Sequence, residues 1–181
     1  MYQLEVKIKL LADLLFNPLS ESDSERIVDS ETGGRKSREE KMKAASQKIY
    51  RNGHNLVVPK HMLDAVLLCG CKMAKLSHGK SALWKYLKAT VFVENDADLG
   101  TDEPDYMHHA TIIKKDGTVV ACFRPAIKVG RQIAFTISAL DDNITVNQIA
   151  NALRAGGIYC GLGSNRPRYG RYEVMACKKV E

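Results

Sequence analysis

The sequence predicts an α+β domain in which two main helices cover one face of an antiparallel sheet. Residues 3–10 alternate strictly between polar and apolar side chains, the pattern of a strand with one buried face. Residues 60–76 place their apolar side chains at helical spacing, and so does the segment that follows Thr145. Alternation returns at 132–139. Because strand and helix patterns are interleaved along the chain, we expect a mixed fold.

The composition fits one globular domain. The chain has 181 residues, of which 45% are hydrophobic and 27% charged, so it is not a disordered chain. Its apolar runs are short or broken by Lys or Asp, and we expect no membrane segment. The first residues alternate and do not form the apolar centre of a signal peptide. Five cysteines without regular spacing favour reduced thiols, and we expect a cytoplasmic protein.

The chain before its first main helix contains two strands, a loop and a short helix. Strand 3–10 is followed by an apolar stretch that ends in an Asn-Pro pair. Residues 20–38 are rich in Ser, Asp and Glu, and we expect a mobile insertion because such a composition cannot bury a core. A short helix is expected at 39–49, and a turn at Asn52–Gly53 leads into strand 56–58.

The middle of the chain carries the first main helix. Pro59 stands where proline favours a helix start, directly before 60–76. A shorter helix at 82–87 and a strand at 88–93 are expected next. Residues 94–105 contain six acidic residues and no basic ones, and we expect an acidic loop there.

The last part of the chain carries the clearest local signals. Strand patterns at 111–114 and 118–123 flank an Asp-Gly turn and predict a hairpin. Thr145 opens a capping box, which begins the second main helix. Gly156–Gly157 is expected to end this helix, because glycine tolerates the left-handed backbone of a helix end. The last strand is expected at 169–177.

The order strand, helix, two or more strands, helix, strand is the split βαβ pattern of the ferredoxin-like fold. We therefore expect one ferredoxin-like domain over residues 1–181, with a long loop after its first strand. The sheet face without helices would then be open to a ligand, as it is for RNA in RRM-type domains.

The net charge of +6 lies in the last third of the chain. Residues 1–50 hold nine basic and nine acidic side chains, 51–110 hold seven of each, and 111–181 hold eleven and five. Near the end, guanidinium groups and aromatic rings alternate at Arg166, Arg168, Tyr169, Arg171 and Tyr172. Guanidinium groups bind phosphates and aromatic rings stack on bases, so this pattern favours a single-stranded nucleic acid as partner.

A glycine-rich segment, residues 161–171, stands directly before the last strand. It is not a dinucleotide-binding fingerprint, which follows a strand and opens a helix, nor a P-loop, which ends in Gly-Lys-Ser/Thr. We expect a flexible turn of Gly, Ser and Asn, whose backbone can approach a partner closely. Exposed amides and arginines together suit phosphodiester oxygens, and we therefore expect a phosphate-contacting loop.

This segment resembles the glycine-rich loop of the CRISPR-associated RAMP superfamily, in which a Gly-x-Gly turn and a later Gly-Arg-aromatic group lead into the last strand of a ferredoxin-like domain. Residues 55–66 are similar to the strand, proline, turn and helix of the RAMP backbone subunits that coat guide RNA. The chain looks most like the compact stand-alone relatives found in bacteriophages and other mobile elements. It departs from the family at Ser164–Asn165, where many relatives carry a bulkier residue or a different spacing.

The resemblance implies a non-catalytic protein that binds single-stranded RNA or DNA and self-associates along the strand. The residues that would face nucleic acid are Lys60, His61, Gly161, Gly163, Arg166, Arg168 and Arg171. The rings that flank basic residues, and that we expect to stack on bases, are Tyr169, Tyr172 and Trp84. The sequence does not choose between RNA and DNA, because nothing in it identifies a reader of the 2′-hydroxyl.

Two other functions stay open from the sequence. Some RAMP proteins are metal-independent endoribonucleases that use a histidine as general acid or base; here Tyr50 with His54, or Lys60 with His61, would form the pair. A protein-interaction module that mimics a RAMP subunit would instead use the mobile insertion and the acidic loop as its interface.

No metal and no cofactor are expected. Cys69 and Cys71 would diverge on a helix, and His108 and His109 would point to opposite faces of a strand. The acidic run at 94–105 lacks the spacing of a calcium-binding loop.

Overall fold

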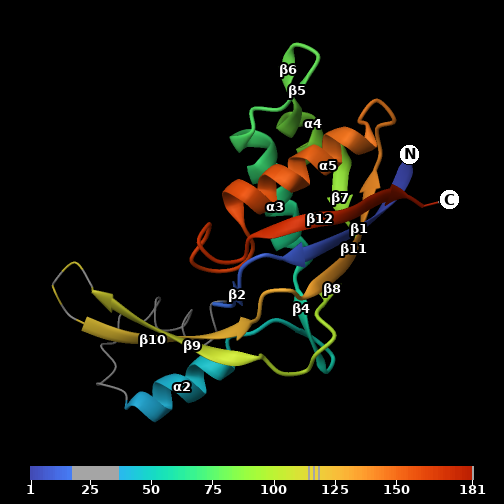
Figure 1. Cartoon of the computed structure of the whole chain (residues 1–181). Coiled ribbons are helices and arrows are strands. Elements are labelled where there is room, and N and C mark those ends of the chain that lie inside the picture. The colour runs from blue at the N-terminus through green and yellow to red at the C-terminus, as the bar shows by residue number, and fades with distance from the viewer. Residues whose placement is uncertain (18–36, 114, 116, 118, 181) are drawn as a thin grey trace, which may run out of the picture.

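A four-stranded antiparallel sheet lies at the centre of the computed structural model, which describes residues 1–17, 37–113, 115, 117 and 119–180 (Figure 1). Its strands, in spatial order, are β12 (Tyr172–Lys179), β1 (Tyr2–Leu10), β11 (Gln132–Ala139) and β7 (Val91–Val93). Each neighbouring pair is antiparallel. The predicted mixed fold with an antiparallel sheet is confirmed. The insertion expected at 20–38 lies for the most part outside the described residues.

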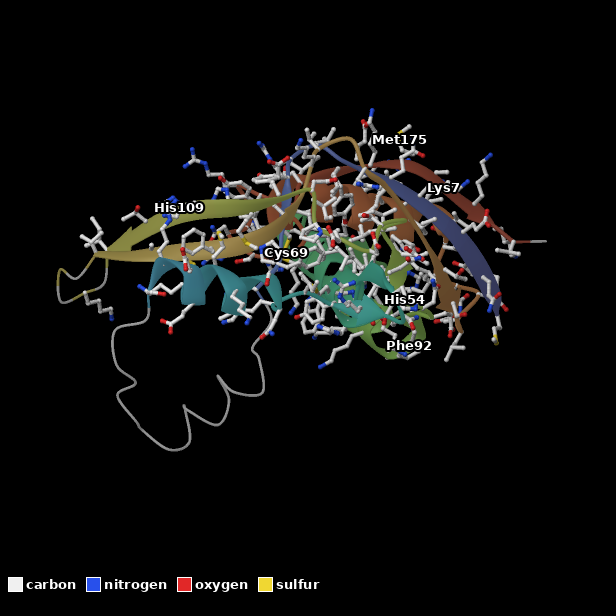
Figure 2. The ribbon with its side chains drawn as sticks, turned by 90° about the horizontal axis from the view of Figure 1, so that it is seen from below. Lys7, His54, Cys69, Phe92, His109 and Met175 are labelled. Carbon is white, nitrogen blue, oxygen red and sulfur yellow. A yellow bond between two sulfur atoms is a disulfide. The ribbon has the colours of Figure 1, made fainter. Side chains whose placement is uncertain are left out.

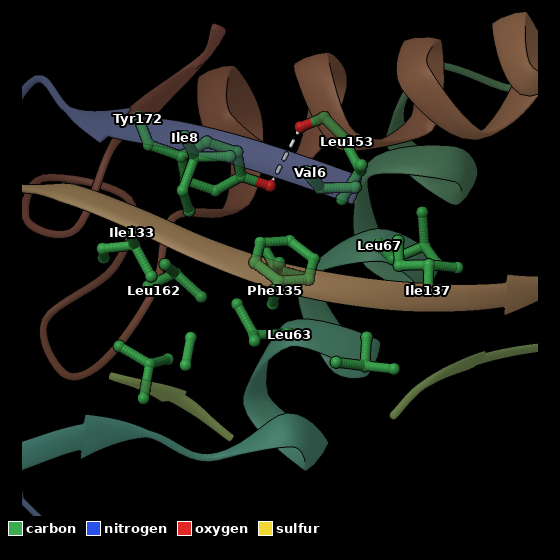
Figure 3. Packing of buried hydrophobic residues seen from close by; sticks show 14 of the residues in the cluster. Val6, Ile8, Leu63, Leu67, Ile133, Phe135, Ile137, Leu153, Leu162 and Tyr172 are labelled. Atoms are coloured by element: carbon green, nitrogen blue, oxygen red, sulfur yellow. Dashed lines mark hydrogen bonds between the residues drawn. The ribbon is translucent and has the colours of Figure 1, made fainter. Parts of the chain in front are cut away.

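Three helices cover one face of this sheet: α3 (Lys60–Met73), α4 (Leu83–Thr90) and α5 (Val146–Ala155). The alternation in β1 explains the packing, because Leu4, Val6, Ile8 and Leu10 are fully buried. Figure 3 shows Val6 and Ile8 in one apolar cluster with Leu67 of α3 and Leu153 of α5. Both predicted main helices are confirmed. Residues 88–90, which we expected to begin a strand, form the last turn of α4.

The end of α5 differs from the prediction. Thr145 opens the helix with the expected capping box. Gly156 and Gly157 do not end it, however, since the chain continues through them into a π-helical turn, η1 (Gly156–Cys160). A Cβ atom on Gly157 would lie 2.1 Å from the carbonyl oxygen of Tyr172. Glycine is therefore required here by the close packing of the helix against the last strand, and not by a left-handed helix end.

A long hairpin extends from the sheet (Figure 1). Strand β9 (Tyr106–Ile113) pairs with β10 (Val119–Ile127), and the short strand β2 (Leu14–Leu15) pairs with the base of β10. Helix α2 (Arg38–Ser46) lies along one side of this hairpin, as Figure 2 shows. The predicted hairpin is confirmed, and both of its strands reach further toward the sheet than we expected.

Short strands complete the described elements. β3 (Arg51–Asn52), β4 (Asn55–Val58) and β8 (Ala97–Asp98) form a small sheet, and β5 (Ser77–His78) pairs with β6 (Ser81–Ala82). Because β8 lies within 94–105, this stretch is not the plain loop that we expected.

The acidic residues of 94–105 hold neighbouring elements in place. Asp96 Oδ1 accepts a hydrogen bond from the backbone amide of Lys60 at 2.8 Å, at the start of α3. Asp98 Oδ2 accepts one from the side chain of Asn55 at 2.7 Å, and this bond lowers the pKa of Asp98. Asp105 pairs with Arg131 at 3.1 Å. Several of these carboxylates therefore stabilise the fold.

The prediction that all five cysteines are reduced is wrong for two of them. Cys69 on α3 and Cys160 at the end of η1 form a disulfide across a sequence separation of 91 residues. Their sequence spacing does not suggest a pair, because only the packing of α3 against η1 brings the two sulfur atoms together. Cys71, Cys122 and Cys177 are free.

Candidate nucleic-acid interface

The glycine-rich segment 161–171 has a fixed shape. The amide of Leu162 donates a hydrogen bond to the carbonyl oxygen of Gly170 at 2.8 Å, which closes the loop on itself. The amides of Ser164 and Gly170 donate to the carbonyl oxygens of Leu15 and Asp13, each at 2.8 Å. The loop is therefore tied to Asp13, which precedes β2, and to Leu15 of β2 itself. β12 begins only after it, at Tyr172, and not at 169 as we expected.

The glycines of this loop serve its own packing. Gly163 has a φ of +73°, and a Cβ atom there would lie 2.4 Å from the carbonyl oxygen of Leu15. Gly170 has a φ of +71°, and its Cβ atom would lie 1.8 Å from the carbonyl oxygen of Leu162. Gly161 is buried. The loop is thus not the flexible turn that the composition suggested, because its glycines let the backbone pack against itself and β2.

Three arginines project from this ordered loop. Arg166, Arg168 and Arg171 are all exposed. Within the described part of the chain, none of their side chains has an ion-pair or hydrogen-bond partner. The loop therefore presents three guanidinium groups that are free to bind an anion from solution.

Tyr169 joins the loop to the hairpin. Its ring lies 5.2 Å from the ring of His108 on β9, measured between centroids, and His108 lies 6.4 Å from Tyr106. The Tyr106 hydroxyl donates a hydrogen bond of 2.5 Å to Asp13, and burial together with this bond raises the pKa of Tyr106 to about 12. A row of three half-buried rings therefore runs from the loop along β9.

The sequence did not indicate that Tyr106 and His108 lie beside residues 161–171, which we call the arginine loop. The two residues stand two apart on a strand, so the alternation of β9 places them on one face. Their contact with Tyr169 depends on how the loop folds back over the hairpin, and no local pattern shows it. His109 points to the opposite face, as expected, and stacks on Phe123 at 4.8 Å.

Lys60 and His61 lie elsewhere. They form the first turn of α3. The disulfide joins η1 to the same helix at Cys69, which lies about 14 Å along the helix axis from Lys60 at a rise of 1.5 Å per residue. No described contact links either side chain to the glycine-rich loop. Of the predicted contact residues, the structure thus brings together those of 161–171 and leaves the α3 pair apart from them.

The structure pairs His61 with Tyr50, not with the loop. The two ring centroids are 6.0 Å apart in an edge-on arrangement. Asp64 lies one turn further along α3, and burial raises the pKa of its carboxyl group. A hydrogen bond from the amide of Val93 and the charges of Lys60 and His61 partly offset this rise. His54, the other predicted partner of Tyr50, is exposed and has no described ring contact with it.

Of the three rings expected to meet bases, Tyr172 is buried in the core. Tyr172 is only 2% exposed, and its hydroxyl donates a hydrogen bond to the carbonyl oxygen of Leu153 at 2.9 Å (Figure 3). The Nζ atom of Lys72 lies 4.5 Å above the ring of Trp84, on α4. Tyr169 is the ring that stands in the arginine loop itself.

The open face of the sheet carries no stacking platform on its two central strands. The side chains that β1 turns away from the helices are Gln3, Glu5, Lys7 and Lys9. Those of β11 are Gln132, Ala134, Thr136 and Ser138. Lys7 projects outward in Figure 2. RRM-type domains stack bases on aromatic side chains of this face, so the expected RNA-binding use of the sheet face has no support in these strands.

The described residues offer no metal site. Nowhere among them do three or more His, Cys, Asp or Glu side chains gather as a metal ion would require. No described helix is both long and apolar enough to cross a membrane.

Comparison with known proteins identifies a structural relative and no sequence relative. No protein-family model matches this chain, and no curated protein matches it either. A chain in the cryo-EM structure of the Type III-B Cmr-beta bound to cognate target RNA aligns with 99% of this chain, with a TM-score of 0.64 and 15% sequence identity. The two chains share a fold. This chain spans 61% of the length of the Cmr-beta chain.

Proposed function

We propose that this protein is a RAMP-type subunit that binds single-stranded RNA and contacts its phosphate backbone through the loop 161–171. The observation that carries the proposal is the arrangement of Arg166, Arg168 and Arg171 on an ordered loop beside the ring contact of Tyr169 with His108. The three arginines are exposed, and no described residue pairs with them. The fold shared with a chain of an RNA-bound Cmr-beta complex supports RNA over DNA.

The sheet order supports the ferredoxin-like assignment that the sequence suggests. The first strand, β1, lies between β11 and β12, and β7, the first strand of this sheet after the main helix α3, lies at the edge. One main helix connects β1 to β7 and the other connects β11 to β12. This order supports a split βαβ unit, with the hairpin and the short strands as additions to it.

Phosphate contacts would dominate the affinity. A guanidinium forks onto phosphate oxygens, and the ring of Tyr169 offers a face on which one base stacks. Neither contact reads base identity, so the protein binds RNA of many sequences. That copies assemble along one strand is part of the same proposal, supported by the exposed Ile158 and Tyr159 on η1, directly before the loop.

We propose a cytoplasmic location as well, where the Cys69–Cys160 disulfide would meet reducing conditions. The phage or mobile-element origin stays a prediction from the sequence.

Fluorescence anisotropy with a fluorescein-labelled oligouridine tests the proposal. The triple variant R166A/R168A/R171A should bind at least about a hundredfold more weakly, and the slope of log K against log salt should fall by about 2, because each lost phosphate contact removes about 0.7. The matched control K85A/K88A/R154A loses three exposed cations from α4 and α5 and should bind like the wild type. Equal losses in both variants, or no loss in either, would overturn the assignment.

A second candidate function is RNA cleavage at the start of α3. The observation that favours it is the ring contact between Tyr50 and His61 next to Lys60, since a histidine beside a cation and a phenol can transfer protons at a scissile phosphate. Incubation of labelled RNA with the protein in EDTA tests it. Cleavage that disappears in H61A and persists in H54A supports this candidate, and intact RNA after long incubation excludes it.

A further inference from the structure

Arg124, on β10, is a buried cation for which the described part of the chain provides no partner. Its side chain is only 7% exposed. The Nε of Arg124 is buried and has no hydrogen-bond partner among the described residues. No other buried side-chain nitrogen or oxygen of the described residues lacks one. No described carboxylate lies within ion-pair distance of it. Only the Nε is fully enclosed, so the two terminal nitrogens of the guanidinium keep a small exposed area, through which a ligand would have to reach them.

The hairpin register places Arg124 on the side of the arginine loop. Arg124 lies directly opposite His108 in the β9–β10 pair, and residues opposite one another in an antiparallel pair share a face. His108 in turn contacts Tyr169 of the loop at 5.2 Å. Arg124 therefore belongs to the junction between the hairpin and the loop 161–171, and not to the side of the hairpin that α2 covers.

The carboxylate of this junction is already engaged. Asp13 Oδ2 accepts a hydrogen bond from the Tyr106 hydroxyl at 2.5 Å, and Asp13 Oδ1 accepts one from the amide of Val129 at 2.8 Å. Neither oxygen is bonded to Arg124. The junction thus contains a buried positive charge that no described residue compensates.

A buried charge without a counter-charge is costly, because the ion loses its hydration and gains no partner. Within the fold, a methionine at this position would fill similar space without that cost. An anion that enters between the hairpin and the loop would remove the cost by pairing with the guanidinium. The three arginines of the loop would attract the same kind of ligand to the same junction.

We propose that Arg124 is a buried anchor for one phosphodiester group of the bound RNA, at the junction of the hairpin and the loop 161–171. This inference rests on the proposed function and assigns it a specific contact. The guanidinium donates to two oxygens of one phosphate, while the rings of His108 and Tyr169 lie beside the adjoining nucleotide. The loop arginines contact neighbouring phosphates at the surface.

Four proteins test this inference: the wild type, R124M, R124K and the control R154M, which removes an exposed cation from α5. Binding to a fluorescein-labelled oligouridine is measured by anisotropy at several salt concentrations, and stability by urea unfolding. R124M should bind at least about tenfold more weakly, with a salt slope lower by about 0.7, and should be as stable as the wild type or more stable. R124K should bind with intermediate affinity, because lysine keeps the charge and loses the fork. R154M should bind like the wild type.

The outcomes separate the two proposals. If the wild type does not bind RNA, the proposed function fails and the Arg124 anchor fails with it. If R166A/R168A/R171A binds weakly and R124M binds like the wild type, the function stands and the anchor is overturned. A loss of stability in R124M equal to its loss of affinity would assign Arg124 a structural role and also overturn the anchor. If R124M does not fold, the test rests on R124K. An R124K protein that binds RNA as tightly as the wild type overturns the anchor, and a stably folded R124K protein that binds more weakly supports it.

Discussion

The rings of His108 and Tyr169 lie 5.2 Å apart, one on the hairpin and the other in the arginine loop. This contact joins two parts of the molecule that are distant in the sequence and that the four-stranded sheet does not connect. It places an aromatic ring in the same loop as three guanidinium groups that pair with no described residue. The hairpin and the loop therefore form one surface, on which a flexible strand would meet charge and rings together.

Replacement of the Tyr169 ring tests this surface. In Y169A, a stacked base would lose its platform, which is worth about 1–3 kcal/mol, so RNA affinity should fall roughly tenfold or more. Y169F keeps the ring and should stay within about twofold of the wild type. Anisotropy measures both variants, and urea unfolding checks that Y169A remains folded. Equal affinities for Y169A and Y169F would show that the ring is not used.

The fixed shape of the loop depends on Gly170. In G170A, the new Cβ atom would lie 1.8 Å from the carbonyl oxygen of Leu162, in addition to the strain of a φ of +71°. We expect the free energy of unfolding to fall by about 3 kcal/mol, from both overpacking and left-handed strain. Gly130 provides a matched control, since its φ is +92° and no atom lies within 4 Å of its Cβ position. G130A should therefore lose only about 1 kcal/mol in urea unfolding. Equal losses would contradict a steric role for Gly170.

Much of the fold could be predicted because it depends on local periodicity. Strand β11 has the predicted bounds, since its alternation reflects one face on the core and one in solvent. The capping box at Thr145 needs only residues within one helical turn, and it was predicted as well. The charge of the loop arginines likewise favours their exposure, although Arg124 is buried in spite of the same charge.

The rest depends on neighbours that are distant in the sequence. The sequence predicted that Gly157 ends a helix, but this glycine instead allows the helix to pack closely against Tyr172 of the last strand. The local sequence around Gly157 does not indicate this contact. The bridge from Cys69 to Cys160 depends on how α3 packs on η1. Arg124 gave no signal, because its isolation results from what surrounds it in the folded hairpin and not from its place in the sequence.

The buried phenol of Tyr172 predicts a loss of stability at high pH. Burial raises its pKa above the ordinary value of 10.0, so above about pH 10 the unfolded chain gives up a proton that the folded chain keeps. The folded state then binds more protons, and the free energy of unfolding falls as the pH rises, by up to about 1.4 kcal/mol per pH unit for this group.

Y172F isolates this contribution. At neutral pH it should be less stable by about 1 kcal/mol, because the hydrogen bond to the carbonyl oxygen of Leu153 is lost. Between about pH 9 and about pH 11, its stability should fall less steeply than that of the wild type, as measured by urea unfolding. Y159F, at an exposed position, is the control and should follow the wild type. Parallel pH curves for Y172F and the wild type would refute the prediction.

The disulfide between Cys69 and Cys160 should contribute strongly to stability. It closes a segment of the chain with a sequence separation of 91 residues, and a bridge over such a length restricts the unfolded chain severely. The double variant C69S/C160S should lose about 3 kcal/mol of unfolding free energy, and wild type treated with dithiothreitol should lose a similar amount. Cys71 will not replace either partner, because burial raises the pKa of its thiol to about 11 and keeps it protonated. Dithiothreitol should leave the double variant unchanged. If the oxidised and reduced wild type unfold at the same urea concentration, the bridge does not stabilise the folded chain.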